Sequence, residues 1–131
     1  MQATQEKIQT FLSAPAFAVV GASDDPTKYG HKVFMNYLRH DMKAYPVNPR
    51  CDQIGGSQVY KRLSELPEPV ESISIITPPV VTDKVVDDAI ACGVKNIWMQ
   101  PGAESQTAID KAEKAGISVI YGGPCVLIEL A

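Results

Sequence analysis

Short apolar runs alternate with amphipathic stretches along this chain, and this alternation constrains the fold more than any other feature. The first run, FAVV at residues 17–20, contains no polar residue and ends at Gly21. A strand that is apolar on both faces is typical of a parallel sheet covered by helices on both sides. Similar runs predict further strands at residues 44–47, 73–76, 96–100 and 117–121, with a very short strand at 59–60.

The stretches between these strands have the spacing of amphipathic helices. Apolar residues recur at intervals of three and four, which predicts helices at residues 4–13, 30–40, 79–92 and 106–115 and one helical turn near Leu63. Pro79 suits the first turn of its helix, and Ser105 is the predicted N-cap of the last one. The predicted buried face of the third helix consists of Val81, Val85, Val86, Ala89 and Ile90.

Strands and helices that alternate in this way predict right-handed βαβ crossovers within one parallel sheet. We therefore expect an α/β fold: a Rossmann-like, doubly wound parallel sheet of about five strands with helices on both faces. The 131 residues are enough for one such domain, so residues 1–131 are predicted to form a single domain. Ligands of these folds bind beyond the carboxyl ends of the strands.

Charge and composition narrow the range of partners. The net charge is −3, with eight Lys and Arg against six Asp and Glu in residues 1–65, and four against nine in residues 66–131. An acidic chain without a basic stripe is a poor nucleic-acid binder, although its basic first half suits one small anionic ligand. No apolar run is long enough to span a membrane and no signal peptide is recognisable, so we expect a cytoplasmic protein. The three cysteines lack the spacing of a disulfide framework or zinc site, so no metal is expected.

The loop after the first strand has the composition of a phosphate-binding turn. Gly21, Ala22 and Ser23 are small enough to let backbone N–H groups approach a phosphate, Lys28 adds positive charge, and Gly30 opens the next helix. The spacing matches neither G-x-G-x-x-G nor a Walker loop. The alternative is a tight turn whose glycines serve only the backbone geometry.

The end of the second strand points to a ligand with a phosphorylated ribose. NAD-binding domains usually carry Asp or Glu there for the ribose hydroxyls, whereas this chain has Asn48, Pro49 and Arg50. A guanidinium pairs with a phosphate that a carboxylate would repel, which favours coenzyme A or NADP. The alternative is an Asn-Pro turn beside a solvated arginine.

Two further loops are expected at the same edge of the sheet. One of them leads from a strand into a helix and contains Thr77, Pro78 and Pro79, which would form one wall of a nucleotide crevice. The alternative is that these residues only initiate the helix. Cys125 follows the last strand, where its thiol could form a mixed disulfide with a thiol cofactor. The commoner role of such a cysteine is that of a small packed apolar residue.

Together these segments resemble the coenzyme A-binding domain family, which includes the N-terminal domain of the succinyl-CoA synthetase alpha subunit and the corresponding domain of ADP-forming acetyl-CoA synthetases. The resemblance extends over residues 15–129. It rests on Val20-Gly21-Ala22-Ser23 with Pro26, Lys28 and Gly30; Tyr45-Pro46-Val47-Asn48-Pro49-Arg50; Ile75-Ile76-Thr77-Pro78-Pro79; Ala91-Cys92-Gly93-Val94-Lys95; and Gly123-Pro124-Cys125.

This resemblance implies a domain that binds the ADP portion of coenzyme A. Gly21 to Ser23 and Lys28 would lie along the pyrophosphate, Asn48 and Arg50 near the ribose and its phosphate, and Thr77 to Pro79 beside the nucleotide. The synthetases transfer phosphate through a histidine in a following domain, and neither His31 nor His40 matches it. The chain thus resembles the small free-standing members of the family.

Three functions remain open from the sequence. The first, which the loop chemistry, the missing ribose carboxylate and the resemblance favour, is binding of coenzyme A or an acyl-CoA through its ADP portion, with no catalytic residues and no catalysis of its own. The second is a small NADP-linked oxidoreductase, or a nucleotide-binding subunit of a larger enzyme. The third is a sensor that responds to coenzyme A by binding a protein partner. The fold permits all three.

Overall fold

Five short strands form one parallel sheet in the computed structural model, which describes residues 3–130. The strands are β1 (Phe17–Val20), β2 (Ala44–Val47), β5 (Ser72–Ile75), β6 (Asn96–Met99) and β7 (Ser118–Ile120), in the spatial order β2-β1-β5-β6-β7. Every residue of β1, β5 and β6 is buried, including the polar Ser72, Ser74 and Asn96, which is typical of strands covered on both faces. The predicted α/β fold with a parallel sheet is confirmed.

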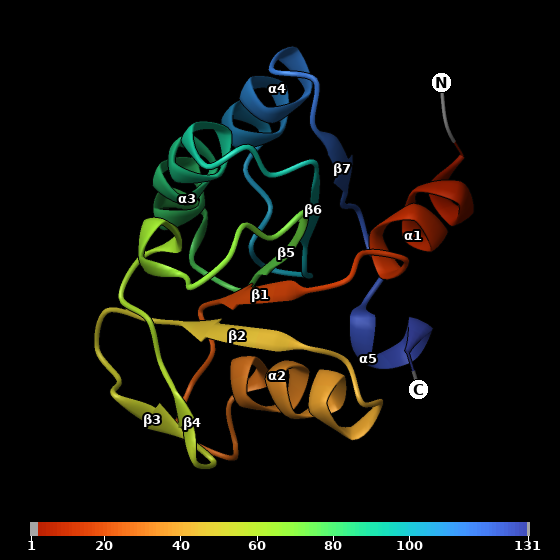
Figure 1. Cartoon of the computed structure of the whole chain (residues 1–131). Helices are drawn as coiled ribbons and strands as arrows, with labels where there is room; N and C mark the ends of the chain where they lie inside the picture. Colours follow the sequence, from red (N-terminus) through yellow and green to blue (C-terminus); the bar gives the residue numbers. More distant parts are fainter. Residues whose placement is uncertain (1–2, 131) are drawn as a thin grey trace.

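Helices cover both faces of this sheet (Figure 1). One face carries α3 (Pro79–Ala91), α4 (Gln106–Lys114) and the short 3-10 helix η1 (Leu63–Glu65). The other carries α1 (Thr4–Leu12), α2 (Tyr29–Arg39) and α5 (Val126–Glu129). The side chains of β1 divide between these layers, because Ala18 and Val20 point to the first while Phe17 and Val19 point to the second.

The second layer is built around aromatic side chains. Phe11 of α1 packs edge-on against Trp98 with ring centroids 5.3 Å apart, and Phe17 stacks on Tyr37 of α2 at 5.0 Å. The Tyr37 hydroxyl and Ser74 Oγ, both buried, are hydrogen-bonded at 2.6 Å. Trp98 is fully buried, and these contacts fix α1 and α2 against the sheet.

The chain changes direction in the sheet between β1 and β5. After β1 it moves outward to β2, and it then crosses back to begin the run β5, β6 and β7 on the other side. A crevice at the carboxyl ends of the strands forms at such a switch point. Two close backbone contacts shape this point, because a Cβ added at Gly21 would lie 2.3 Å from the Ile76 carbonyl oxygen, and one at Gly30 would lie 2.2 Å from the Gly21 oxygen.

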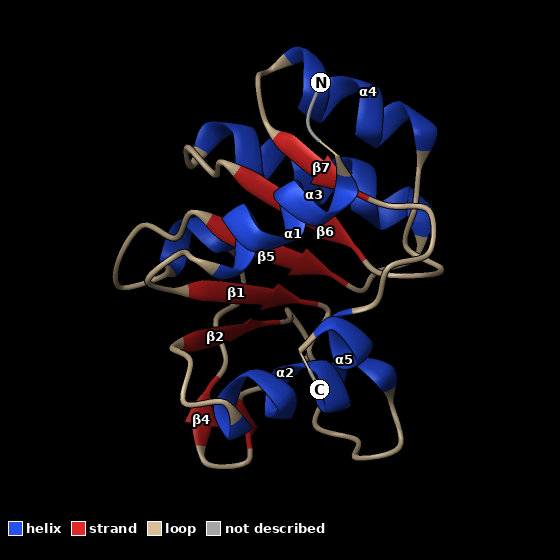
Figure 2. Ribbon diagram, turned by 90° about the vertical axis from the view of Figure 1, so that its right-hand side faces the viewer, coloured by secondary structure: helices blue, strands red, loops and turns tan. Residues whose placement is uncertain are grey.

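Several local predictions need correction. In place of a strand at Val59–Tyr60, a hairpin forms from β3 (Gln53–Ile54) and β4 (Ser57–Gln58), which Figure 2 shows beside the β4 label. Tyr60 makes only an isolated bridge to Val47. The turn between β3 and β4 is Gly55-Gly56, whose positive φ angles of 55° and 84° suit glycine. The short helix α5 has no counterpart among the predicted elements. Val81 and Ile90 of α3 are not buried, with exposed fractions of 40% and 38%.

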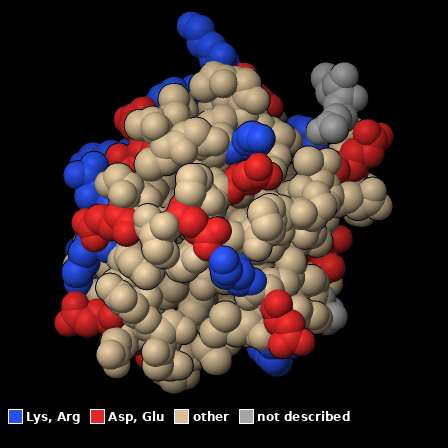
Figure 3. Space-filling view, viewed as in Figure 1, with Lys and Arg blue, Asp and Glu red and all other residues tan. Residues whose placement is uncertain are grey.

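The surface and the helices bear on the possible partners. In Figure 3, side chains of both signs are interspersed with uncharged surface on the face shown, without a continuous field of one charge. No helix within residues 3–130 is long and apolar enough to cross a membrane. Over the same residues, His, Cys, Asp and Glu side chains nowhere gather in groups of three suited to a metal ion.

Candidate functional site

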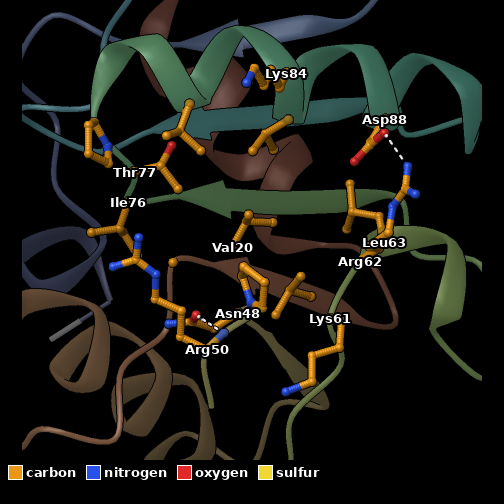
Figure 4. Close-up of a pocket in the computed structure, with 16 residues that line it drawn as sticks. Val20, Asn48, Arg50, Lys61, Arg62, Leu63, Ile76, Thr77, Lys84 and Asp88 are labelled. Carbon is orange, nitrogen blue, oxygen red and sulfur yellow. Dashed lines mark hydrogen bonds and ion pairs between the residues drawn. The ribbon is translucent and has the colours of Figure 1, made fainter. Parts of the chain in front are cut away.

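A cavity of about 440 Å³ lies at the carboxyl ends of β1, β2 and β5, at the switch point of the sheet (Figure 4). This volume is within the range of small-molecule binding sites. Its apolar wall comes from strand ends, from η1 and from one face of α3. The lining residues are Val20, Gly21, Val47, Asn48, Pro49, Arg50, Lys61, Arg62, Leu63, Ile76, Thr77, Pro78, Val81, Lys84, Val85 and Asp88.

Backbone hydrogen bonds hold the strand ends of this cavity together. The Gly21 N–H donates to the Val47 carbonyl at 2.9 Å, and the Ile76 N–H donates to the Val20 carbonyl at 2.8 Å. These bonds continue the parallel ladders one residue beyond each strand. The cavity therefore has a rigid base in the sheet and borders two loops, 21–28 and 48–52.

Asn48 connects these two loops through its side chain. Its Nδ2 donates to the Ala22 carbonyl at 2.7 Å, while its Oδ1 accepts the Arg50 N–H at 2.8 Å. Both the nitrogen and the oxygen of the Asn48 carboxamide are thus hydrogen-bonded within the protein. Asn48 therefore positions the backbone of both loops, and the Arg50 side chain is the polar group of this loop left to face a ligand.

The loop after β1 offers unsatisfied donors to an anion. Within residues 3–130, the N–H groups of Ser23 and Asp24 donate no hydrogen bond. Ser23 Oγ accepts the Asp25 N–H at 3.1 Å, which leaves its hydroxyl hydrogen free to donate. Lys28 is exposed at the N-cap of α2. Free N–H groups and a hydroxyl in a loop that leads into a helix are of the kind that bind phosphate oxygens.

Four cationic side chains line the cavity, and two of them are paired. Lys61 forms an ion pair with Asp52 at 3.0 Å and points away from the cavity in Figure 4, while Arg62 pairs with Asp88 of α3 at 3.3 Å. Arg50 and Lys84 form no ion pair with any of the residues from 3 to 130. Arg50 extends toward Ile76 in the same view. Its guanidinium and the Lys84 ammonium are therefore the uncompensated charges at the cavity.

The eleven residues singled out from the sequence divide into two groups. The cavity wall includes Gly21, Asn48, Pro49, Arg50, Thr77 and Pro78. The other five do not line it: Ala22 is fully buried, Ser23 is half-buried in the adjoining loop, Lys28 and Pro79 are exposed, and Gly30 packs behind Gly21. The Thr77 hydroxyl is hydrogen-bonded to that of buried Thr82 at 2.8 Å, which fixes the entry into α3.

Sequence reasoning missed the part of the wall formed by α3 and by the segment after the hairpin. Val81, Lys84, Val85 and Asp88 follow the three- and four-residue spacing of one helix face. The charged Lys84 and Asp88 on this stripe are a usable signal that the face reaches solvent or a ligand, but not that it borders this cavity. Lys61, Arg62 and Leu63 carried no comparable signal.

Comparisons with known proteins agree with this picture. The model of the CoA binding domain family matches residues 15–131. An acetate–CoA ligase (ADP-forming) II subunit alpha from Pyrococcus furiosus is 30% identical over 127 residues, and a trans-feruloyl-CoA synthase from an unknown prokaryotic organism is 31% identical over 125 residues. These matches cover 88% and 91% of this chain, which spans only 28% and 18% of the length of those two relatives.

Solved structures of similar size share the fold. A conserved hypothetical protein from Pyrococcus furiosus is 38% identical with a TM-score of 0.82, over 87% of this chain and 97% of its own. A hypothetical protein from Pyrococcus horikoshii is 26% identical with a TM-score of 0.91, over 98% and 89%. The family match spans nearly the whole chain, including every strand end that surrounds the cavity. The chain belongs to the CoA binding domain family.

Proposed function

We propose that this protein binds coenzyme A or an acyl-CoA through the ADP portion of the ligand and performs no catalysis of its own. The observation that carries the proposal is the unpaired Arg50 guanidinium at a cavity of nucleotide size. Membership of the CoA binding domain family supports coenzyme A as the ligand. Residues 1–131 would then act as a single binding domain.

In this proposal the adenosine occupies the cavity, between the strand ends and the apolar face of α3. The ribose phosphate lies near Arg50, and the pyrophosphate lies along Gly21, Ala22 and Ser23, with Lys28 nearby. A planar guanidinium suits two oxygens of a phosphate, and the free N–H groups of the loop that precedes α2 suit the pyrophosphate. Gly30 allows the loop and helix to approach closely, and the stretch from Thr77 to Pro79 bounds the nucleotide.

Calorimetric titration with coenzyme A and with dephospho-coenzyme A tests the role of Arg50. Charge-assisted hydrogen bonds contribute about 1.5–3 kcal/mol. Arg50 is exposed, so water screens it and the lower end applies. We expect the wild-type protein to prefer coenzyme A by about tenfold, and Arg50→Ala to lose this preference while it still binds both ligands.

Lys61→Ala is the matched control, since it also removes one positive charge from the cavity lining. Lys61 is already paired with Asp52, so the preference for coenzyme A should persist in this variant. Equal wild-type affinity for the two ligands would contradict the role given to Arg50. Binding of NADPH with no binding of coenzyme A would instead favour the oxidoreductase. Because no catalysis is proposed, mass spectrometry should show that acyl-CoA stays unchanged after incubation with a stoichiometric amount of the protein.

A further inference from the structure

A second polar cluster lies at the same edge of the sheet, beyond β6 and β7. Gln100 follows β6 and is fully buried, Tyr29 begins α2, and Cys125 precedes α5. The Tyr29 hydroxyl donates to Gln100 Oε1 at 3.0 Å, and the Val126 N–H donates to the same oxygen at 3.0 Å. The Tyr29 hydroxyl also contacts Cys125 Sγ. Because the one hydrogen of the Tyr29 hydroxyl goes to Gln100, the Cys125 thiol is the donor in the contact between Tyr29 and Cys125.

The Gln100 side chain also contains a buried hydrogen-bond donor that has no acceptor. Gln100 Nε2 has no hydrogen-bond partner among residues 3–130. Both hydrogen bonds to Oε1 fix the orientation of the side chain, so the free nitrogen is held beside Tyr29 and Val126. Buried side-chain nitrogens are normally satisfied, and an exception of this kind indicates a position where a ligand supplies the acceptor. The amide carbonyls of pantetheine are suitable acceptors.

The distance along the sheet edge matches the reach of that arm. The cavity borders β2, β1 and β5, and Gln100 follows the next strand, β6. Adjacent strands are about 4.8 Å apart, so the cluster is roughly 5–10 Å along the edge from the switch point. The pantetheine arm has about as many backbone bonds as four extended residues, or roughly 13 Å. The space beside Gly122 and Gly123 is open, since a Cβ at either position meets no atom within 4 Å.

We propose that Cys125 exchanges its thiol with the disulfide form of coenzyme A, with the pantetheine arm held against Gln100. This inference rests on the proposed function. The Cys125 thiol loses its proton, and the thiolate attacks one sulfur of coenzyme A disulfide. The sulfur–sulfur bond of the ligand breaks, and a new one joins Cys125 to the bound half. The other half leaves as a thiolate and takes up the released proton, so Cys125 is oxidised and one coenzyme A is reduced.

Tyr29 is the positioning residue in this reaction. Burial raises the pKa of its hydroxyl above the ordinary value, and the hydrogen bond with Cys125 raises it further, so the group keeps its proton. When Cys125 ionises, the Tyr29 hydrogen turns from Gln100 to the thiolate and stabilises it. Tyr29→Phe should therefore lower the rate of the exchange step while the coenzyme A affinity measured by calorimetry stays unchanged, which a loss of packing alone would not do.

Intact-mass spectrometry of the full chain after incubation with coenzyme A disulfide tests the exchange. We expect one coenzyme A adduct, which peptide mapping of the wild-type protein assigns to Cys125. Cys125→Ser should abolish the adduct, while Cys92→Ser should retain it. Cys92 is the matched control because it is also a half-buried free cysteine, but it follows α3 at the opposite edge of the sheet.

The comparison of two disulfides separates guided exchange from general thiol reactivity. Binding of the nucleotide raises the effective concentration of the ligand disulfide at Cys125. The rate with coenzyme A disulfide should exceed that with glutathione disulfide by about tenfold or more, and adenosine 3′,5′-bisphosphate should reduce it. Equal rates, an adduct on Cys92 or no adduct would overturn the inference. If calorimetry still detects coenzyme A binding in that case, the proposed function stands, and if it does not, the proposed function fails as well.

Discussion

Gly21→Ala is the substitution that tests most directly how the switch point is built. Gly21 has a φ angle of 97°, where a Cβ collides with the residue's own backbone. That conformation costs an L-residue about 1–2 kcal/mol. The new Cβ would also lie 2.3 Å from the Ile76 carbonyl oxygen, a backbone atom at the end of a central strand. Overpacking of this kind costs about 1–3 kcal/mol, so the free energy of unfolding should fall by about 2–5 kcal/mol.

Two control variants separate these contributions. Gly56→Ala carries the backbone strain alone, because its φ angle is 84° and its Cβ would meet no atom within 4 Å. Gly30→Ala carries the close approach alone, since Gly30 is helical and its Cβ would lie 2.2 Å from the Gly21 carbonyl oxygen. Helix propensity favours alanine there by about 1 kcal/mol, which offsets part of the cost. All three substitutions reduce the entropy of the unfolded chain alike, so their differences report on the native state.

Urea unfolding of the four proteins, followed by circular dichroism, measures these free energies. Gly21→Ala should be the least stable variant and should bind coenzyme A more weakly at concentrations of urea where it remains folded. Gly56→Ala should bind as the wild-type protein does, since the hairpin turn does not line the cavity. If Gly21→Ala is no less stable than Gly56→Ala, the close approach to Ile76 does not restrict this position.

Three further perturbations have defined outcomes. Asn48→Ala removes one hydrogen bond between the loops and one within the 48–52 loop, and it should lower the free energy of unfolding in urea by about 1–2 kcal/mol, with a larger loss of coenzyme A affinity than Lys61→Ala causes. Tyr37→Phe and Ser74→Ala should each lower the free energy of unfolding by about 1–3 kcal/mol, because each leaves the buried hydroxyl of the other residue unpaired. The double variant should lose less than the sum of the two single losses, because it leaves neither hydroxyl behind. The hydrogen bond from Lys43, and after it the one from Tyr45, lowers the pKa of the Glu68 carboxyl. The ionised carboxylate should therefore stabilise the fold slightly above pH 4.5, and this stabilisation should disappear as the pH falls further. In thermal melts at different pH values, Glu68→Gln should remove this pH dependence of the melting temperature.

The sheet and the longer helices were predictable because burial imposes a regular pattern on them. The strands around residues 17–20 and 44–47 have the predicted bounds, and Ser105 accepts the N–H of Ala108 as an N-cap. The hairpin strands are two residues each, too short to show an alternation. The four residues of α5 cannot complete two turns, so no helical spacing was visible. Its position depends on contacts with α2, including the Asn36 side chain that donates to the Leu130 carbonyl at 2.9 Å.

The candidate site was only partly predictable, for a physical reason. Loop residues at strand ends can be located once the sheet topology is inferred, because parallel strands bring their carboxyl ends to one edge. This reasoning found the turns that contain Gly21, Arg50 and Thr77. It does not reveal which helix face closes the cavity. Lys84 reaches the wall only because α3 packs with that face toward β5 and η1, and this orientation follows from tertiary packing.

The pairing of charges decides which cations are available to a ligand. The basic first half of the chain suggests that Lys61 and Arg62 would attract an anion, but each already faces a carboxylate. A phosphate that approached either of them would first compete with Asp52 or Asp88. Arg50 meets no such competition within residues 3–130, and neither does Lys84, which belongs to the acidic half. The affinity for an anionic ligand should therefore follow these two unpaired side chains and not the surplus of basic residues in the first half.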